Sequence, residues 1–180
     1  MKLKTSIILC TVVGMVSGAS AFADSAWDLY VGATVGAGAE TIFADDKNST
    51  DPAQSFGAMF GIDLPAFRVE AEYNYLGKKD VHSHLAFMNA YFKMPSTVIK
   101  PYMGIGLGLL IDGEDKEFHA DMDPSVAYQG MLGVTLDVPG LPCKFDIEGR
   151  AVYIPDVYEI GDIEPDILHY DARVKIRYLF

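Results

Sequence analysis

The chain has 180 residues, of which 50% are hydrophobic, 12% aromatic and 22% charged, and its formal net charge is −11 at pH 7. This length suits one domain. The acidic balance excludes the basic surface on which nucleic-acid binding depends, so we expect no nucleic-acid partner.

The first 23 residues predict a secretory signal peptide rather than a part of the fold. A positive start with two lysines leads into a short apolar run at 7–16, and residues 20–23 supply the small side chains of a cleavage site. The alternative, an N-terminal anchor helix, is disfavoured because the run is shorter than the roughly 20 apolar residues that span a bilayer. We therefore expect a signal peptide at 1–23 and one folded domain at 24–180.

Removal of this segment changes the mature chain in two ways. Loss of its two lysines takes the formal net charge from −11 to −13. Cys10 leaves as well, so Cys143 is the single thiol of the mature chain. An internal disulfide is therefore excluded, although an exported protein meets an oxidising compartment.

Eight segments of the mature chain alternate apolar and polar side chains with a period of two, as β-strands with two different faces do. In chain order they are 27–37, 55–64, 66–76, 85–94, 102–111, 126–138, 143–153 and 169–180. The length of each segment is close to the roughly 9–11 residues that a tilted strand needs to cross the hydrocarbon layer. No apolar stretch after the signal is long enough for a membrane-spanning helix, and the remaining way to cross a bilayer is a closed β-barrel.

The last of these strands carries the clearest two-sided pattern. Its apolar face comprises Tyr170, Ala172, Val174, Ile176, Tyr178 and Phe180, whereas its polar face includes His169, Asp171, Arg173, Lys175 and Arg177. A strand of this kind fits between lipid and a polar lumen. Phe180, with Tyr178 and Ile176 on the same face, resembles the C-terminal assembly signal of bacterial outer-membrane β-barrels, which the barrel assembly machinery would recognise.

The connections between the segments also alternate. Those after the even strands are short and contain proline, whereas those after the odd strands are longer, at 38–54, 77–84, 112–125 and 154–168. Short periplasmic turns and long outer loops are typical of outer-membrane barrels. This pattern predicts a cell outer-membrane location with both termini in the periplasm.

A secreted soluble barrel with its apolar face turned inward is the alternative. The polar face argues against it, because it is rich in glycine, as at Gly104, Gly106 and Gly108. Glycine weakens a strand, but inside a narrow barrel it makes room for large neighbours such as Tyr91 and Tyr102. The apolar faces are also nearly free of charge along their full length.

A central stretch of the chain resembles a known family. It reads Leu85-Ala-Phe-Met-Asn89-Ala-Tyr91-Phe-Lys, then Lys100-Pro-Tyr102-Met-Gly104-Ile-Gly106-Leu-Gly108. This is similar to a recurrent hairpin of the OmpA-like and opacity-protein-like small outer-membrane barrels, often labelled porin-family surface antigens. The resemblance implies an all-β fold, an eight-stranded antiparallel transmembrane β-barrel of a Gram-negative outer membrane. That family includes structural barrels, adhesins, narrow channels and a few lipid-modifying enzymes. Because the chain stops at the barrel, no peptidoglycan-binding domain is implied.

The polar faces of the strands predict an ion-pair network inside the barrel. Its expected members are Arg68, Glu70, Glu72, Lys93, Asp146, Glu148, Arg150, Arg173, Lys175 and Arg177. Pairing of neighbouring strands would set Asp146 and Glu148 against the cations of the last strand, and Glu70 and Glu72 near Lys93. Since eight strands enclose a space that side chains nearly fill, we expect the network to rigidify and close the lumen. The alternative is the gate or selectivity region of a narrow pore.

The four long loops concentrate the negative charge. They contain Glu40, Asp45, Asp46, Asp51, Asp80, Asp112, Glu114, Asp115, Glu117, Asp121, Asp123, Asp156, Glu159, Asp162, Glu164 and Asp166, against Lys47, Lys78, Lys79 and Lys116. The simplest interpretation is a solvated, repulsive surface that prevents aggregation. Divalent cations bridging these acids to lipid phosphates, or a basic host or cell-surface partner, are the alternatives.

The histidines give no clear catalytic or metal-binding pattern. His82, His84, His119 and His169 all fall in or just below the outer loops, but no spacing among them demands a metal. An enzyme that modifies lipid A would need a histidine beside a serine or aspartate, and His82-Ser83-His84 is the one adjacent candidate. We expect no catalytic residue, no cofactor and no metal site.

The sequence thus predicts a non-enzymatic outer-membrane protein with a structural role or an adhesin or surface-antigen role through acidic extracellular loops. Its expected partners are outer-membrane lipid, lipopolysaccharide, the assembly machinery and a host or cell-surface ligand. A narrow channel for small solutes is the first alternative, and an envelope enzyme acting on lipid A is the second.

Overall fold

The computed structural model describes residues 27–44, 47–78, 81–94, 99–115, 120–121, 125–137, 140–155 and 166–180. The expected signal peptide lies outside these residues, and so do parts of the expected long loops. Within the described residues no helix is long and apolar enough to cross a membrane.

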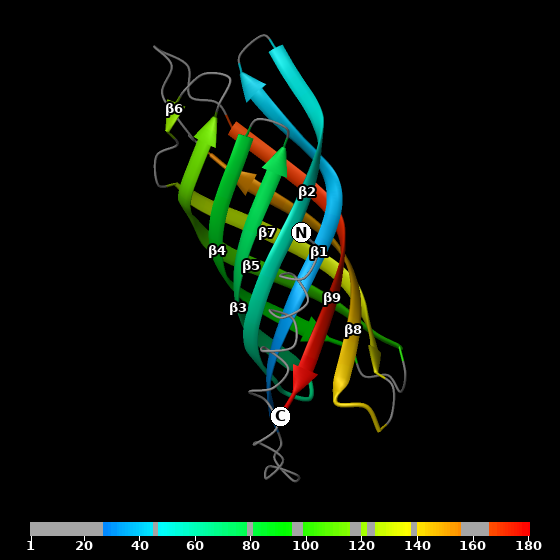
Figure 1. The fold of residues 1–180 in the computed structure, drawn as a ribbon. Helices are drawn as coiled ribbons and strands as arrows, with labels where there is room; N and C mark the ends of the chain where they lie inside the picture. Colours follow the sequence, from blue (N-terminus) through cyan, green and yellow to red (C-terminus); the bar gives the residue numbers. More distant parts are fainter. Residues whose placement is uncertain are drawn as a thin grey trace, which may run out of the picture.

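One antiparallel sheet makes up the described fold, and it closes on itself (Figure 1). Its strands are β1 (Asp28–Ala44), β2 (Lys47–Asp63), β3 (Phe67–Lys78), β4 (Val81–Lys93), β5 (Ile99–Asp115), β6 (Ala120–Asp121), β7 (Val126–Asp137), β8 (Cys143–Ile154) and β9 (Asp166–Leu179). Strands β1 to β5 pair in chain order, β5 pairs with β7, β7 to β9 again pair in order, and β9 pairs with β1. The two-residue strand β6 pairs with the end of β5. The predicted eight-stranded antiparallel barrel is confirmed.

The period of two in the sequence separates the two faces of the barrel wall. Along β9, Arg173, Lys175 and Arg177 are buried in the lumen, whereas Val174 and Ile176 lie on the outer wall. Charged side chains inside and apolar side chains outside are the reverse of the arrangement in a water-soluble protein, and they are typical of a barrel surrounded by lipid.

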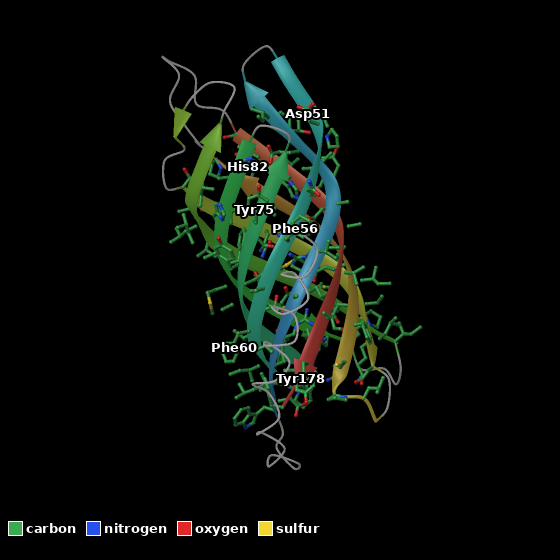
Figure 2. All side chains as sticks on the ribbon, in the orientation of Figure 1. Asp51, Phe56, Phe60, Tyr75, His82 and Tyr178 are labelled. Atoms are coloured by element: carbon green, nitrogen blue, oxygen red, sulfur yellow. The ribbon has the colours of Figure 1, made fainter. Side chains whose placement is uncertain are left out.

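The barrel has a turn end, where Phe180 lies and where β2 connects to β3, β4 to β5 and β7 to β8, and a loop end, where β1 connects to β2, β3 to β4 and β8 to β9 (Figure 1). At the turn end the rings of Phe67 and Phe92 pack edge to face with centroids 5.6 Å apart. Toward the loop end, Phe56 stands opposite Tyr75 on the neighbouring strand. Figure 2 shows Tyr75 nearer the loop end and Tyr178 near the turn end. Aromatic side chains therefore occupy both ends of the outer wall, as they do at the two membrane interfaces.

Several strands continue beyond their predicted ends. Most of the expected loop at 38–54 is a hairpin of β1 and β2, in which the hydroxyls of Thr41 and Thr50 lie 2.9 Å apart. The expected loop at 77–84 is likewise mostly strand. Beyond the apolar belt the apolar alternation stops, although the backbone pairing continues. The sequence pattern marks the belt rather than the strand.

Candidate functional site

The middle of the lumen is held by a charged cluster around Arg173. The guanidinium donates from Nε to Glu148 Oε1 at 2.6 Å and from Nη1 to Glu72 Oε1 at 2.5 Å. Lys175 follows two residues later on β9, toward the turn end. Its Nζ lies 3.0 Å from Glu70 Oε1 and 3.5 Å from Glu148 Oε2. Two cations of β9 therefore bind carboxylates from both sides of the lumen, and together they fill its cross-section.

Closer to the turn end, Arg177 and Arg68 share the carboxylate of Asp146. Arg177 binds it with two parallel hydrogen bonds of 2.8 and 2.9 Å, and Arg68 donates to it at 2.9 Å. Arg177 also reaches Asp63 at 3.2 Å. Bidentate guanidinium–carboxylate pairs fix orientation as well as charge, so this level of the lumen is rigidly filled too.

The position of Lys93 differs from the sequence expectation. Its Nζ donates to Asp63, which also accepts from Lys144 at 3.1 Å. The register explains the difference, because Glu70 stands opposite Asn89, four residues before Lys93 on β4. Lys93 therefore lies at the turn end, away from Glu70 and Glu72, whose cationic partners Lys175 and Arg173 come from β9.

Near the loop end the network ends on Asp171. Arg150 binds its carboxylate with hydrogen bonds of 3.1 and 2.6 Å, Ser55 donates to it at 2.5 Å, and His169 Nε2 lies 3.2 Å away. Glu40, expected in an outer loop, is buried beside His169. Ser55 and His169 meet at one carboxylate rather than forming the direct serine–histidine pair that nucleophilic catalysis needs.

Aromatic rings fill the space between the charges. Tyr91 and Tyr102 pack edge to face, and the Arg68 guanidinium lies 3.9 Å from the centre of the Tyr91 ring. Gly133 makes this possible, because a Cβ added there would lie 2.6 Å from the Tyr102 ring. Gly104 faces Tyr91 in the same way. The glycines of the polar face thus admit large side chains into a narrow lumen.

An apolar cluster lies inside the barrel beyond the charged network, toward the loop end. It contains Leu76, Leu85, Phe87, Leu110, Ala127, Val152, Ile154 and Ile167, with Ile42 packed against it. Sequence reasoning missed this cluster. The signal was present, because Leu76, Val152 and Ile167 continue the lumen-facing positions of β3, β8 and β9 past the last polar residue.

The tripeptide His82-Ser83-His84 does not bring a serine to a histidine. Strand alternation buries Ser83 in the lumen, while His84 and His82 lie on the outer wall, where their Nδ1 atoms are 2.6 Å from the hydroxyls of Tyr73 and Tyr75. Among the side chains that the structure describes, no three of the His, Cys, Asp and Glu type are grouped to hold a metal ion. His119 lies outside the described residues.

The outer wall carries an apolar groove of about 780 Å³. It crosses β2 to β5 and β7, and its exposed lining comprises Ala58, Phe60, Ala71, Tyr73, Ala86, Met88, Leu107, Leu109 and Val126. The groove arises because alanines lie between large side chains on neighbouring strands. It opens outward.

The predicted assembly residues lie at the turn end of the outer wall. The rings of Tyr178 and Phe180 pack edge to face with centroids 5.5 Å apart, and Ile176 is exposed on the same face. The Phe180 amide donates to the carbonyl of Leu29 at 2.9 Å. The last residue is thus tied to β1, at the seam where the barrel closes.

Comparison with known proteins identifies the fold. No protein-family model matches the sequence, and no curated protein matches it. Neisserial surface protein A (NspA) is similar in structure with a TM-score of 0.60 and 16% identity, over 82% of this chain and 96% of that one. The chain has the fold of a small outer-membrane β-barrel. The N-terminal β-barrel domain of Pseudomonas aeruginosa OprF is also similar, with a TM-score of 0.55 and 12% identity, over 84% of this chain and 97% of that one.

In barrels of this class the outer face of the wall contacts lipid and the inner face lines the lumen. The exposed apolar wall, in which Ile105 is 73% and Leu132 67% accessible, is the surface that such barrels present to lipid. The apolar groove is part of that surface. The resemblance drawn from the Asn89–Tyr91 and Tyr102–Gly108 hairpin is borne out at the level of the fold.

Proposed function

We propose that this outer-membrane barrel is a closed, non-enzymatic surface protein that acts through its acidic extracellular loops. The observation that carries the proposal is the filled lumen. Arg173 and Lys175 join carboxylates across the middle of the barrel, and the apolar cluster around Phe87 and Ile154 fills the space toward the loop end. Because side chains fill the lumen both at Arg173 and at the apolar cluster, the loops are the part of the molecule that can bind a partner.

The proposed orientation puts both termini in the periplasm and the loop end outside the cell. The extended hairpin of β1 and β2 and the segment 155–165 between β8 and β9 support it, since outer-membrane barrels keep short turns on the periplasmic side. The assembly machinery would then act on Phe180, Tyr178 and Ile176 at the turn end, and lipopolysaccharide would surround the loop end.

The loop acids favour a basic partner on a host or neighbouring cell. The segment 154–168 carries five acids and no lysine or arginine. Charge of one sign steers oppositely charged partners and repels like surfaces. Glu40 does not belong to this surface, because it is buried in the lumen.

The alternatives find less support in the geometry. A channel needs a continuous polar path, but the charged side chains are paired with one another and the apolar cluster lies beyond them. An enzyme acting on lipid A needs a nucleophile at the outer lipid interface. Ser83 is buried in the lumen, on the opposite face from His82 and His84.

Adhesion of intact cells tests the proposed role. Changing Asp156, Glu159, Asp162 and Glu164 to their amides is expected to leave the amount of folded barrel unchanged, because none of them belongs to the paired segments of β8 and β9 that the structure describes. The change is expected to reduce binding of the cells to epithelial monolayers. Folded barrel is measured by its heat-modifiable mobility in electrophoresis.

The matched control neutralises charge at the turn end with Asp137→Asn, which should not alter adhesion. Antibody against residues 156–165 should also label intact cells. Unchanged adhesion by the loop variant would contradict the proposed role of the loops. Labelling that requires permeabilised cells would contradict the orientation.

A further inference from the structure

The apolar groove on the outer wall has a floor of alanines between large side chains. Ala71 stands between Phe60 on β2 and Met88 on β4. In the neighbouring row, Ala86 stands opposite Tyr73. The volume of about 780 Å³ lies within the range of roughly 300–1,000 Å³ that is usual for small-molecule sites. The groove can therefore hold part of an apolar ligand.

Hydrogen-bonding side chains border the groove on the side of the loop end. His84 is the next outward-facing residue after Ala86 on β4, and its Nδ1 lies 2.6 Å from the hydroxyl of Tyr73, which lines the groove. His82 and Tyr75 repeat this pair nearer the loop end, also at 2.6 Å (Figure 2). The rings of both pairs stack, with centroids 5.9 and 5.6 Å apart. A groove with an apolar floor and an ordered polar border matches an amphiphile.

The histidines lie at the loop-end edge of the apolar band. Phe92, at the turn end, follows His82 by ten residues on β4. Ten residues extend about 33 Å along a strand, or about 25 Å along the axis of a barrel whose strands tilt by about 40°. That length equals the height of the apolar band of an outer-membrane barrel, about 25 Å. An acyl chain that descends from this edge to the middle of the bilayer would therefore pass along Ala86 and Met88.

We propose that the groove and the two histidines above it form a binding site for one molecule of lipid A, the phosphorylated glycolipid that anchors lipopolysaccharide. An acyl chain would lie along the alanine floor, and a phosphate would bind at His84 and His82. The assignment rests on the proposed orientation, in which the loop end lies outside the cell, because lipopolysaccharide occupies that leaflet.

The chemistry of the histidines favours a phosphate. A tyrosine hydroxyl that donates to Nδ1 places the proton of a neutral imidazole on Nε2, and Nε2–H can then donate to a phosphate oxygen. Tyr73 and Tyr75 are thus positioning residues. The apolar wall of a second barrel would instead cover both imidazoles without offering them an acceptor, and a buried donor without a partner is costly.

Native mass spectrometry of the refolded chain, released from detergent micelles after titration with lipid A, tests the site. We expect one lipid A per wild-type chain, bound more tightly than phosphatidylethanolamine. Ala71→Phe/Ala86→Phe fills the floor of the groove and should weaken lipid A binding by about tenfold or more. The matched control, Ala151→Phe/Ala172→Phe, makes the same change at exposed positions of β8 and β9 outside the groove and should bind like the wild type.

A second pair of measurements tests the polar border. His82→Phe/His84→Phe keeps the rings but removes their nitrogens, and it should weaken lipid A binding by about tenfold, the effect of losing a hydrogen bond to a charged group. Binding of phosphatidylethanolamine should change less. Heat-modifiable mobility confirms that each variant is folded.

Three results would overturn the proposal. The first is undiminished lipid A binding by Ala71→Phe/Ala86→Phe, or an equal loss in its control. The second is equal affinity of the wild type for lipid A and phosphatidylethanolamine. The third is a dimer without bound lipid that Ala71→Phe/Ala86→Phe abolishes, which would assign the groove to a second copy of the chain. Binding in detergent depends neither on orientation in the cell nor on adhesion, so these results are separate from the tests of the proposed function.

Discussion

Replacing Arg173 by methionine is expected to lower the free energy of unfolding by about 3–5 kcal/mol, the cost of leaving buried charges without their partner. Arg173 is 1% exposed and binds Glu148 and Glu72 at once. Methionine fills much of the same space, so the loss reports the charge rather than a cavity. Urea unfolding in lipid vesicles, followed by the fluorescence of the single tryptophan, Trp27, measures it.

Two further variants show whether the effect comes from the ion pairs. Removing the partner acids as well, in Arg173→Met/Glu72→Gln/Glu148→Gln, should recover part of the stability, since an apolar or neutral replacement of a whole buried network is often tolerated. Val174→Ala, on the lipid face next along β9, should change stability by no more than about 0.5 kcal/mol, as surface substitutions do. A methionine variant as stable as the wild type would show that the network does not hold the barrel together.

Replacing Ile105 by arginine is expected to destabilise the barrel in lipid by about 2–4 kcal/mol, the penalty for a cation near the middle of the bilayer. Ile105 is 73% exposed and lies in the middle of β5, opposite Ala90 and Gly130. In a water-soluble barrel, the same substitution at such an exposed residue would change the free energy of unfolding by no more than about 0.5 kcal/mol. The sign and size of the effect therefore distinguish a wall in lipid from a wall in water.

The same strand offers a control for depth. Ile99 is exposed at the turn end of β5, so Ile99→Arg should cost only about 0–1 kcal/mol, because the penalty falls toward the interface. Both variants are measured by urea unfolding in vesicles. Equal, small effects at the two positions would contradict the membrane-spanning placement of β5.

Polarity alternation was sufficient to predict the faces of the strands. A period of two assigns each side chain to one face, and a slip of one residue in β9 would put Arg173, Lys175 and Arg177 into lipid. The register was therefore strongly constrained wherever one face meets lipid. It was weakly constrained beyond the belt, which is why the ends of β1 and β2 were predicted too short.

Partners across the lumen could not be predicted in the same way. Adjacent strands suggested the pairing of Glu148 with Arg173, and the structure places these two together. Glu72 is 101 residues from Arg173 in the chain and belongs to a strand that is not its neighbour, so only the closed barrel brings them within 2.5 Å. For Lys93 the prediction was wrong in the other direction. Lys93 and Glu70 lie on paired strands, but Glu70 stands opposite Asn89 and Lys93 lies nearer the turn end, where it binds Asp63.

The register shift between β4 and β5 could not be predicted either. The ladder shifts between His84 and Leu85, so that Leu85 pairs with Leu110 whereas His84 pairs with Asp112. Nothing in the spacing of the residues along either strand marks that step.

The central claim is that side chains close the lumen, and single-channel recording in planar bilayers tests it most directly. The purified, refolded full chain is expected to insert without stable conductance steps, while a large porin in the same bilayers serves as the positive control. Stable single-channel steps whose size changes on Arg173→Met or Glu148→Gln would contradict the account, because ions would then be passing the level at which Arg173 bridges Glu72 and Glu148.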